Sequence, residues 1–209
     1  MGIKEKYIFG ASGHGKVVAE CIKSNNEVVI GFFDDAPNYS KWNNIPVHFS
    51  NSIPIANTSN GILIAIGNNS IRKKISNRLI DFNFFEIKHQ SAIIGSNVSI
   101  EIGTVVMANT VINSDTYIGK HCIINTSAVI EHDCKIGDFV HVGPKAVLGG
   151  NVSVEEGVLI GIGAILIPGI TIGKWVTIGA GTVVLSNVPD YAVVVGNPGK
   201  IIKYNKLNE

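Results

Sequence analysis

Aliphatic side chains recur every six residues through the second half of the chain. Sixteen successive positions from Ile94 to Val184 are Ile, Leu or Val, and the residue four places after each, up to position 182, is Val, Thr, Cys, Ala or Ile. One large and one small inward residue per six-residue repeat is typical of a left-handed parallel β-helix, a triangular prism with eighteen residues in each coil. The repeats therefore predict a little over five coils.

Glycine is common directly after the aliphatic position, and Gly or Asn is common near the predicted corners. We expect the Gly and Asn residues near the corners to supply the positive φ angles that the turns require. Cys122 and Cys134 fall on the small inward position, where a cysteine behaves as a small apolar side chain. The glycines that follow the aliphatic position include Gly95, Gly119, Gly137, Gly161, Gly173 and Gly179.

The first ninety residues have a different pattern, in which strands alternate with helices. The segments "KYIF", "EVVIGFFDD" and "GILIAIG" read as strands, whereas "GASGHGKVVAECIKS" reads as a Gly-rich turn and helix and "NNSIRKKISNRLID" as a second helix. This order predicts a small Rossmann-like α/β domain with a parallel sheet. We place that domain at residues 1–90 and the β-helix with its C-terminal tail at residues 91–209.

Small and acidic residues follow the predicted strands of the first domain. Ligands of parallel sheets bind beyond the carboxyl ends of the strands, where we expect Gly10 to Gly15, Asp34, Asp35, Gly67 and Asn68 to converge. The two carboxylates could accept hydrogen bonds from ribose hydroxyls or from a base N–H. A solvated turn is the alternative explanation of the two acids.

The segment "GASGHGKV" matches neither of two well-known nucleotide-binding motifs. Val17 stands where a Walker A loop needs Ser or Thr for Mg²⁺, and Gly10, Gly13 and Gly15 do not have the G-x-G-x-x-G spacing. Small residues at a strand-to-helix turn still expose backbone N–H groups that can bind a phosphate at the helix N-terminus. Tight packing of the turn is the competing interpretation.

The composition argues against several classes of partner. Apolar residues make up 45% of the chain and charged residues 16%, with a formal net charge of +1 and no run of like charges. A nucleic-acid partner is therefore not expected. The chain has neither a leader-like N-terminus nor an apolar stretch of membrane-spanning length, and its three cysteines do not suggest a disulfide framework. We expect a cytoplasmic protein that does not bind membranes.

The segment "EHD" places Glu131, His132 and Asp133 near a corner of the predicted prism, while His141 projects outward from a flat side. A carboxylate that accepts one ring N–H fixes the tautomer of a histidine and raises its basicity, as a general base requires. Either acid could have this role. The alternatives are a solvated surface histidine and a metal ligand, and the inward direction of Cys134 disfavours the metal.

Five segments that span nearly the whole chain resemble one protein family: "GASGHGKV", "FFDD", "AIGNN", "INTSAVIEHDCKIGDFVHV" and "VVVGNPGK". The chain is similar to the sialic-acid O-acetyltransferase-like family of bacterial sugar acyltransferases. Within it, the chain resembles most the N-acetyltransferases of nucleotide-linked 4-amino-4,6-dideoxy sugars, as in N-acetylbacillosamine, perosamine and Qui4N pathways. The resemblance implies acetyl-CoA as donor, no metal, a homotrimer with active sites between subunits, and a role in O-antigen or other glycan biosynthesis.

The resemblance also implies roles for individual residues. His132 matches the catalytic base, and Asp133 stands where the bacillosamine-type enzymes have Glu. Asn125 and His141 match residues near the acetyl group. The UDP-, dTDP- and GDP-linked sugars remain alternatives for the acceptor. The expected nucleotide-sugar site comprises the phosphate turn Ser12, Gly13, His14 and Gly15, the base-binding acids Asp34 and Asp35, and Gly67 with Asn68.

These residues predict direct acyl transfer in a ternary complex, in which His132 takes a proton from the sugar amine as the amine attacks the thioester. Gly150 lies one coil above His132, and its backbone N–H could stabilise the oxyanion unless it is only part of a turn. An O-acetyltransferase acting on a sugar hydroxyl, for example of sialic acid, is the nearest alternative. A zinc carbonic anhydrase does not fit the spacing of His132 and His141, and a non-catalytic nucleotide-sugar binder is a further alternative.

Overall fold

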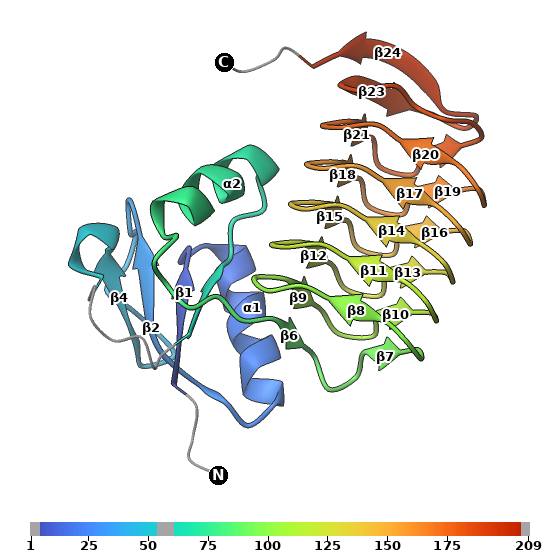
Figure 1. Ribbon diagram of the computed structural model, residues 1–209. Helices are drawn as coiled ribbons and strands as arrows, with labels where there is room; N and C mark the ends of the chain where they lie inside the picture. The colour runs from blue at the N-terminus through green and yellow to red at the C-terminus, as the bar shows by residue number, and fades with distance from the viewer. Residues whose placement is uncertain (1–4, 54–60, 206–209) are drawn as a thin grey trace.

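The computed structural model describes residues 5–53 and 61–205, which form an α/β unit and a column of short strands (Figure 1). The α/β unit lies beside the column, and a hairpin of β23 (Ala192–Val195) and β24 (Lys200–Tyr204) covers the end of the column that is far from the N-terminus. The predicted combination of a Rossmann-like domain and a hexapeptide-repeat β-helix is confirmed.

The α/β unit contains a five-stranded sheet in the order β3-β4-β2-β1-β5, whose strands are parallel except for the antiparallel edge strand β3. The three strands and two helices expected from the sequence are present. Neither helix among the described residues is long and apolar enough to cross a membrane. The elements are β1 (Glu5–Phe9), α1 (Gly13–Ser24), β2 (Val28–Asp34), β3 (Lys41–Trp42), β4 (Ile45–Phe49), a 3-10 turn (Ser50–Ser52), β5 (Gly61–Ile64) and α2 (Asn69–Arg78).

The β3–β4 hairpin was not predicted from the sequence. Its two-residue turn consists of Asn43 and Asn44, which both have positive φ angles of 46° and 64°. Asparagine is among the residues that tolerate this conformation, and a two-residue loop with two positive φ angles matches the right-handed twist of a hairpin. The Asn-Asn pair was therefore the signal for this turn.

The column consists of two-residue strands that pair with strands one coil away. Val111, for example, pairs with Ile93 and with Val129, which confirms the eighteen-residue coil. The column forms three sheets, one of which begins with β6 and continues into the terminal hairpin. The division of the chain near residue 90 remains our prediction. The strands are β6 (Ile87–Lys88), β7 (Ile93–Ile94), β8 (Ser99–Ile100), β9 (Val105–Val106), β10 (Val111–Ile112), β11 (Tyr117–Ile118), β12 (Ile123–Ile124), β13 (Val129–Ile130), β14 (Lys135–Ile136), β15 (His141–Val142), β16 (Val147–Leu148), β17 (Ser153–Val154), β18 (Leu159–Ile160), β19 (Ile165–Leu166), β20 (Thr171–Ile172), β21 (Thr177–Ile178) and β22 (Val183–Val184).

The two inward positions of each repeat form the core of the prism. From Val106 to Val184, every residue in the aliphatic series is at most 3% exposed. Cys122 and Cys134 are fully buried free thiols at the small inward position, as predicted. Because each coil adds the same pair of inward side chains, the core extends without interruption along the column.

The helix α2 attaches the α/β unit to one corner of the prism through backbone carbonyls. Arg72 is 1% exposed and donates from Nε to the carbonyl of His121 and from Nη2 to that of Phe139, both at 2.8 Å. Asn69 Nδ2 donates to the carbonyl of Gly157 at 3.0 Å. These three carbonyls are eighteen residues apart, so α2 follows one corner across three successive coils.

Positive φ angles occur at Gly and Asn residues near the corners, as expected, for example at Asn97 and Gly163. These positions lie two residues after the glycine that follows an aliphatic residue. The glycine after the aliphatic residue is needed for another reason, because the next coil passes directly over it. A Cβ atom on Gly161 would lie 2.6 Å from the backbone nitrogen of Ala180.

Two substitutions in one corner should distinguish the need for space beside the next coil from the need for a positive φ angle. Gly161→Ala should lower the free energy of unfolding by about 1–3 kcal/mol, because the added methyl group overpacks the adjoining coil. Gly163→Asn should cost less, since no atom lies within 4 Å of its Cβ position and asparagine occupies the equivalent positive-φ position at Asn151. Denaturant unfolding measures both values, and equal losses would contradict the steric explanation.

Candidate active site

His132 stands at a corner of the prism between β13 and β14, and its side chain is 62% exposed. Its Nδ1 atom lies 2.7 Å from Oδ2 of Asp133. Glu131, the other candidate partner, instead accepts a hydrogen bond from Asn113 Nδ2 at 2.8 Å. Asp133 has a φ of 60°, a left-handed conformation that aspartate tolerates better than most residues. Thus the carboxylate that pairs with the imidazole is that of Asp133.

The Asp133 carboxylate determines both the tautomer and the basicity of this histidine. Since an ionised carboxylate only accepts hydrogen bonds, Nδ1 of His132 carries the proton and Nε2 is the free basic nitrogen. The hydrogen bond that His132 donates to Asp133 raises the pKa of His132, and the nearby charges of Asp133 and Glu131 raise it further. The pair therefore has the arrangement of an oriented general base.

Gly150 lies against the His132 ring, as the coil spacing predicts. A Cβ atom at Gly150 would be 2.7 Å from both Cε1 and Nε2 of His132, so any side chain here would displace the imidazole. The Gly150 carbonyl accepts from the N–H of Gly169 at 2.9 Å. Its own N–H donates to no acceptor in residues 5–53 and 61–205. This N–H is therefore available to a ligand beside His132.

His141 lies on the face of the prism that adjoins the α/β unit. Its Nδ1 atom is 3.3 Å from the carbonyl oxygen of Gly67, and its Nε2 atom is 3.1 Å from Nδ2 of Asn125. The carbonyl requires a proton on Nδ1, so Nε2 accepts from the Asn125 amide. Oδ1 of Asn125 accepts from the N–H of Thr126 at 2.8 Å. One N–H of Asn125 thus remains for a substrate.

His14, from the Gly-rich turn, approaches His141 with a ring-to-ring distance of 6.4 Å. Burial, followed by the charges of His141 and Arg72, lowers the pKa of His14 to about 4. Burial and Arg72 likewise lower the pKa of His141 to about 4. Both imidazoles are therefore neutral at pH 7, in contrast to the more basic His132.

The Gly-rich turn and β2 are joined through Asp34. Its Oδ2 accepts from the N–H of Ala11 and its Oδ1 from that of Ala36, at 2.8 and 2.9 Å. Gly15 packs so closely on the Gly10 carbonyl that no Cβ fits. No atom lies within 4 Å of a Cβ position on Gly13, and Ser12 is the N-cap of α1 without a side-chain cap bond.

Asp35 and Asn68 have separate local partners. Asp35 pairs with Arg78 at 3.0 Å and accepts from Ser50. Partial burial raises the pKa of Asp35, but the hydrogen bonds from Ser50 and Arg78 outweigh this and lower it overall. The side chain of Asn68 caps α2 by accepting from the N–H of Ile71 at 3.0 Å. Its neighbour Gly67 reaches His141, so the carboxyl end of the third predicted strand meets the prism.

The structure therefore brings together His14, Gly67, Asn125 and His141 but places His132 elsewhere. His141 begins β15 in the sheet that faces α1 and α2, whereas His132 follows β13 at the corner between the other two sheets. Nine residues separate the two histidines, which is half a coil. Within one chain they lie on opposite sides of the prism.

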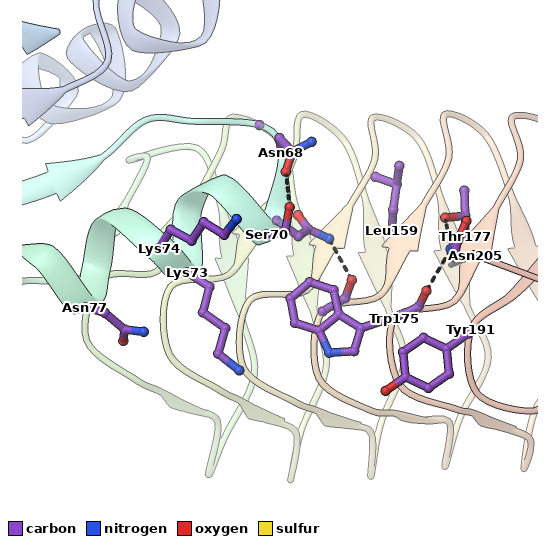
Figure 2. A pocket seen from close by; sticks show the side chains of 13 residues that line it. Asn68, Ser70, Lys73, Lys74, Asn77, Leu159, Trp175, Thr177, Tyr191 and Asn205 are labelled. Atoms are coloured by element: carbon purple, nitrogen blue, oxygen red, sulfur yellow. Dashed lines mark hydrogen bonds between the residues drawn. The ribbon is translucent and has the colours of Figure 1, made fainter. Parts of the chain in front are cut away.

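A groove of about 740 Å³ continues along the prism from Gly67 and was not identified from the sequence. Figure 2 shows Lys73 and Lys74 of α2 along one side of it, opposite Trp175 and Tyr191. The sequence contains only a weak signal for this groove, because the repeat pattern does not show that these side chains are neighbours. The groove is lined by Gly67, Asn68, Asn69, Ser70, Lys73, Lys74, Asn77, Gly157, Leu159, Trp175, Thr177, Tyr191 and Asn205.

Comparisons with known proteins identify the family. The PglD N-terminal domain matches residues 7–79, and the bacterial transferase hexapeptide (six repeats) matches residues 115–150 and 151–186. The crystal structure of PerB from Caulobacter crescentus, in complex with CoA and GDP-perosamine, superposes with a TM-score of 0.90 at 37% identity, covering 97% of this chain and 99% of that one. The chain belongs to the PglD-type hexapeptide-repeat sugar acetyltransferases. The family resemblance expected from the sequence is confirmed.

Two further relatives of this PglD-type acetyltransferase extend the comparison. The acetyltransferase domain of PglB from Neisseria gonorrhoeae, in complex with acetyl coenzyme A, superposes with a TM-score of 0.87 at 34% identity and covers 96% of this chain and 100% of that one. UDP-N-acetylbacillosamine N-acetyltransferase of Bacillus subtilis is 40% identical over 113 residues, 51% of this chain. The match spans 52% of that curated relative, about half its length. No group of three His, Cys, Asp or Glu side chains in the described part of the chain could hold a metal ion.

Replacing Asp133 by Asn should lower the pKa of His132 toward its ordinary value of 6.5. The substitution removes the charge but retains a residue that tolerates the positive φ of this position. The chemical shift of the His132 Cε1 proton, followed against pH, measures the change. Glu131→Gln is the matched control and should cause a smaller shift, because Glu131 bonds to Asn113. Equal shifts in both variants would contradict the assignment of Asp133.

Proposed function

We propose that this chain is an acetyl-CoA-dependent N-acetyltransferase that acts on the amino group of a nucleotide-linked 4-amino-4,6-dideoxy sugar. The observation that carries the proposal is the match over almost the whole chain to PerB, which was crystallised with CoA and GDP-perosamine. The His132–Asp133 pair supplies a base of the kind that amide formation needs. An O-acetyltransferase acting on a sugar hydroxyl is the second candidate, since the same base could deprotonate a hydroxyl.

In the proposed mechanism, Nε2 of His132 takes a proton from the sugar amine as the amine nitrogen attacks the thioester carbon. The C–N bond forms, the C–S bond breaks, and CoA leaves as a thiolate. Asp133 stabilises the imidazolium that forms, through the hydrogen bond to Nδ1. The N–H of Gly150, which lacks a protein acceptor beside this ring, stabilises the oxyanion of the tetrahedral intermediate.

The acceptor site is proposed at the Gly-rich turn and the carboxyl ends of β2 and β5. The space beside Gly13 leaves the N-terminus of α1 open to a phosphate, together with Ser12, His14 and Gly15. Both oxygens of Asp34 already accept hydrogen bonds from backbone N–H groups, so Asp34 fixes the conformation of the turn in this proposal. The more exposed carboxylate of Asp35 is then the better candidate for contact with the nucleoside. Gly67 and Asn68 complete this site near His141.

A second subunit is needed to complete the active site in this proposal. His132 of one chain would meet Asn125 and His141 of its neighbour, because the two histidines face opposite ways within a chain. Closed cyclic symmetry, as in the proposed homotrimer, repeats that contact at each interface. A cytoplasmic location, which the three free cysteines favour, is also part of the proposal.

A panel of acceptors tests the function directly. Purified protein would be incubated with acetyl-CoA and with UDP-, dTDP- and GDP-linked amino sugars, and thiol release would be recorded together with the mass of the product. We expect a mass gain of one acetyl group on one of the 4-amino sugars. Transfer only to sugar hydroxyls would support the O-acetyltransferase instead, and binding without turnover would support a non-catalytic role.

His132→Asn should lower kcat by at least ~10²-fold with little change in the KM for acetyl-CoA, as expected when general-base catalysis is lost. The wild-type rate should rise with pH until both the imidazole and the sugar amine are deprotonated. His89→Asn is a control in a half-buried histidine outside the candidate site, whose Nδ1 bonds to Ser91. A loss of tenfold or less in His132→Asn would rule out this residue as the base.

Mixing two impaired variants tests the shared site. His132→Asn and His141→Ala should each be weakly active alone, and exchange of their subunits should restore activity. About a quarter of the sites in random trimers would combine both intact histidines from neighbouring chains. Native mass spectrometry would verify the exchange. Verified exchange without recovery would contradict a site built from His132 and His141 of different chains.

A further inference from the structure

The interior of the prism contains hydrogen-bond donors that the proposed mechanism does not use. Five small inward side chains each donate to a backbone carbonyl fifteen residues further along the chain. Each of these carbonyls belongs to the residue directly after an aliphatic position, where the chain leaves a strand and enters a corner. The bonds therefore hold the backbone of the corners from inside. The donors and acceptors are Thr104 and Gly119, Thr110 and Asn125, Thr116 and Glu131, Cys122 and Gly137, and Cys134 and Gly149.

The hydroxyl of Thr116 lies inside the corner that carries His132. It donates to the carbonyl of Glu131 at 3.1 Å and accepts from the N–H of Cys134 at 3.4 Å. Since these two residues flank His132 and Asp133, the hydroxyl connects both ends of the corner. Thr116 is 1% exposed, so water does not compete for these bonds.

Cys134 makes the corresponding contact one coil above. Its Sγ atom lies 3.3 Å from the carbonyl oxygen of Gly149. Burial raises the pKa of the Cys134 thiol, so Sγ keeps its proton and can donate it to this carbonyl. Among the small inward positions from residue 128 to residue 176, only Cys134 has a polar hydrogen to donate. In that part of the column, the corner held from inside in this way is the one that contains Gly150.

The peptide unit between Gly149 and Gly150 has no side chain of its own to fix its orientation. Glycine has the widest range of backbone conformations, so two glycines in succession allow the peptide plane to rotate. This peptide is trans, and a trans peptide directs its C=O and N–H groups to opposite sides. The carbonyl that Cys134 holds inside the prism therefore leaves the N–H of Gly150 directed outward, beside the His132 ring.

We propose that Cys134 is a positioning residue for acetyl transfer, whose thiol holds the Gly149–Gly150 peptide with its N–H toward the oxyanion. The inference rests on the proposed function, which assigns this N–H to the tetrahedral intermediate. Cys134 contacts no substrate and forms no covalent intermediate, because it lies in the core. Thr116 makes the matching contact under His132, so the core fixes the base and the oxyanion donor relative to each other. A preorganised donor stabilises the transition state better than a mobile one.

Three substitutions at Cys134 separate hydrogen bonding from packing. Cys134→Ala and Cys134→Val both remove the donor, and valine fills the space, as it does at the equivalent position Val152. Each should lower kcat about tenfold, less than the ~10²-fold or more expected for loss of a whole oxyanion donor, with both KM values little changed. Cys134→Ser should have the wild-type kcat, because its hydroxyl can donate to Gly149 as that of Thr116 does to Glu131.

Cys122→Ala is the matched control. Cys122 is as fully buried as Cys134, occupies the same position of the repeat and donates to the carbonyl of Gly137 at 3.1 Å. Its corner lies between β14 and β15, away from His132. We expect a similar loss of packing in this variant and a wild-type kcat.

Nuclear magnetic resonance tests the contact without substrate. Gly149 and Gly150 are the only adjacent glycines in the chain. If glycine is labelled with ¹³C at the carbonyl and with ¹⁵N, a spectrum that correlates each amide with the preceding carbonyl contains one cross-peak, from this peptide. The cross-peak should move in Cys134→Ala and Cys134→Val and keep its position in Cys134→Ser and Cys122→Ala. A wild-type protein that transfers no acetyl group would contradict the proposed function alone, because the cross-peak is read without turnover.

Several results would overturn the assignment of Cys134. One is a cross-peak that stays in place in both Cys134→Ala and Cys134→Val. A second is a wild-type kcat in both of these variants, and a third is a loss in Cys134→Ala that Cys134→Val does not share, which would indicate packing. An equal loss of kcat in Cys134→Ser or in Cys122→Ala would overturn it as well.

Discussion

One buried guanidinium fixes the position of α2 on the prism. Arg72 donates to the carbonyls of His121, Phe139 and Ile66, each at 2.8 Å, and none of the four ion pairs among the described residues involves it. Burial lowers the pKa of Arg72 to about 10, which leaves it charged at neutral pH. A buried charge is tolerated only where its donors are satisfied, so α2 can occupy only the position in which the prism carbonyls meet those donors. Gly67 and the groove are placed by the same contact.

Burial, together with the charge of Arg72, makes His14 and His141 differ from His132. Near it, His14 and His141 are held neutral by burial and by the guanidinium. His141 hydrogen-bonds to the carbonyl of Gly67 and to the Asn125 amide. Far from it, the exposed His132 has its pKa raised by Asp133. Neutral imidazoles can position a polar substrate without competing for its proton, whereas the basic one can accept that proton. The fold thus places the neutral imidazoles and the more basic one on opposite sides of the prism.

The sequence predicted those features that depend on the local repeat. The inward positions, the buried cysteines and the stacking of Gly150 on His132 all follow from the eighteen-residue coil, because each is fixed by spacing alone. Arg72 and Trp175 were not found, since their roles arise from contact between α2 and a distant corner of the prism. The reason for Gly161 was not found either, because the distance to the next coil, and not the local backbone, excludes a side chain there. What the sequence lacked was therefore the set of contacts between segments far apart in the chain.

The strict pairing of residues one coil apart limits how such a protein can change in length. Insertion of a single residue into a strand would turn every later inward side chain toward solvent, because neighbouring residues of a strand face opposite sides. Addition or loss of a whole coil preserves the alternation and moves the terminal hairpin by one strand spacing, about 4.8 Å. The distance between His141 and the ring of Tyr191 can therefore vary among related proteins only in discrete steps. The strand spacing of the backbone therefore sets the possible lengths of the column, one coil at a time.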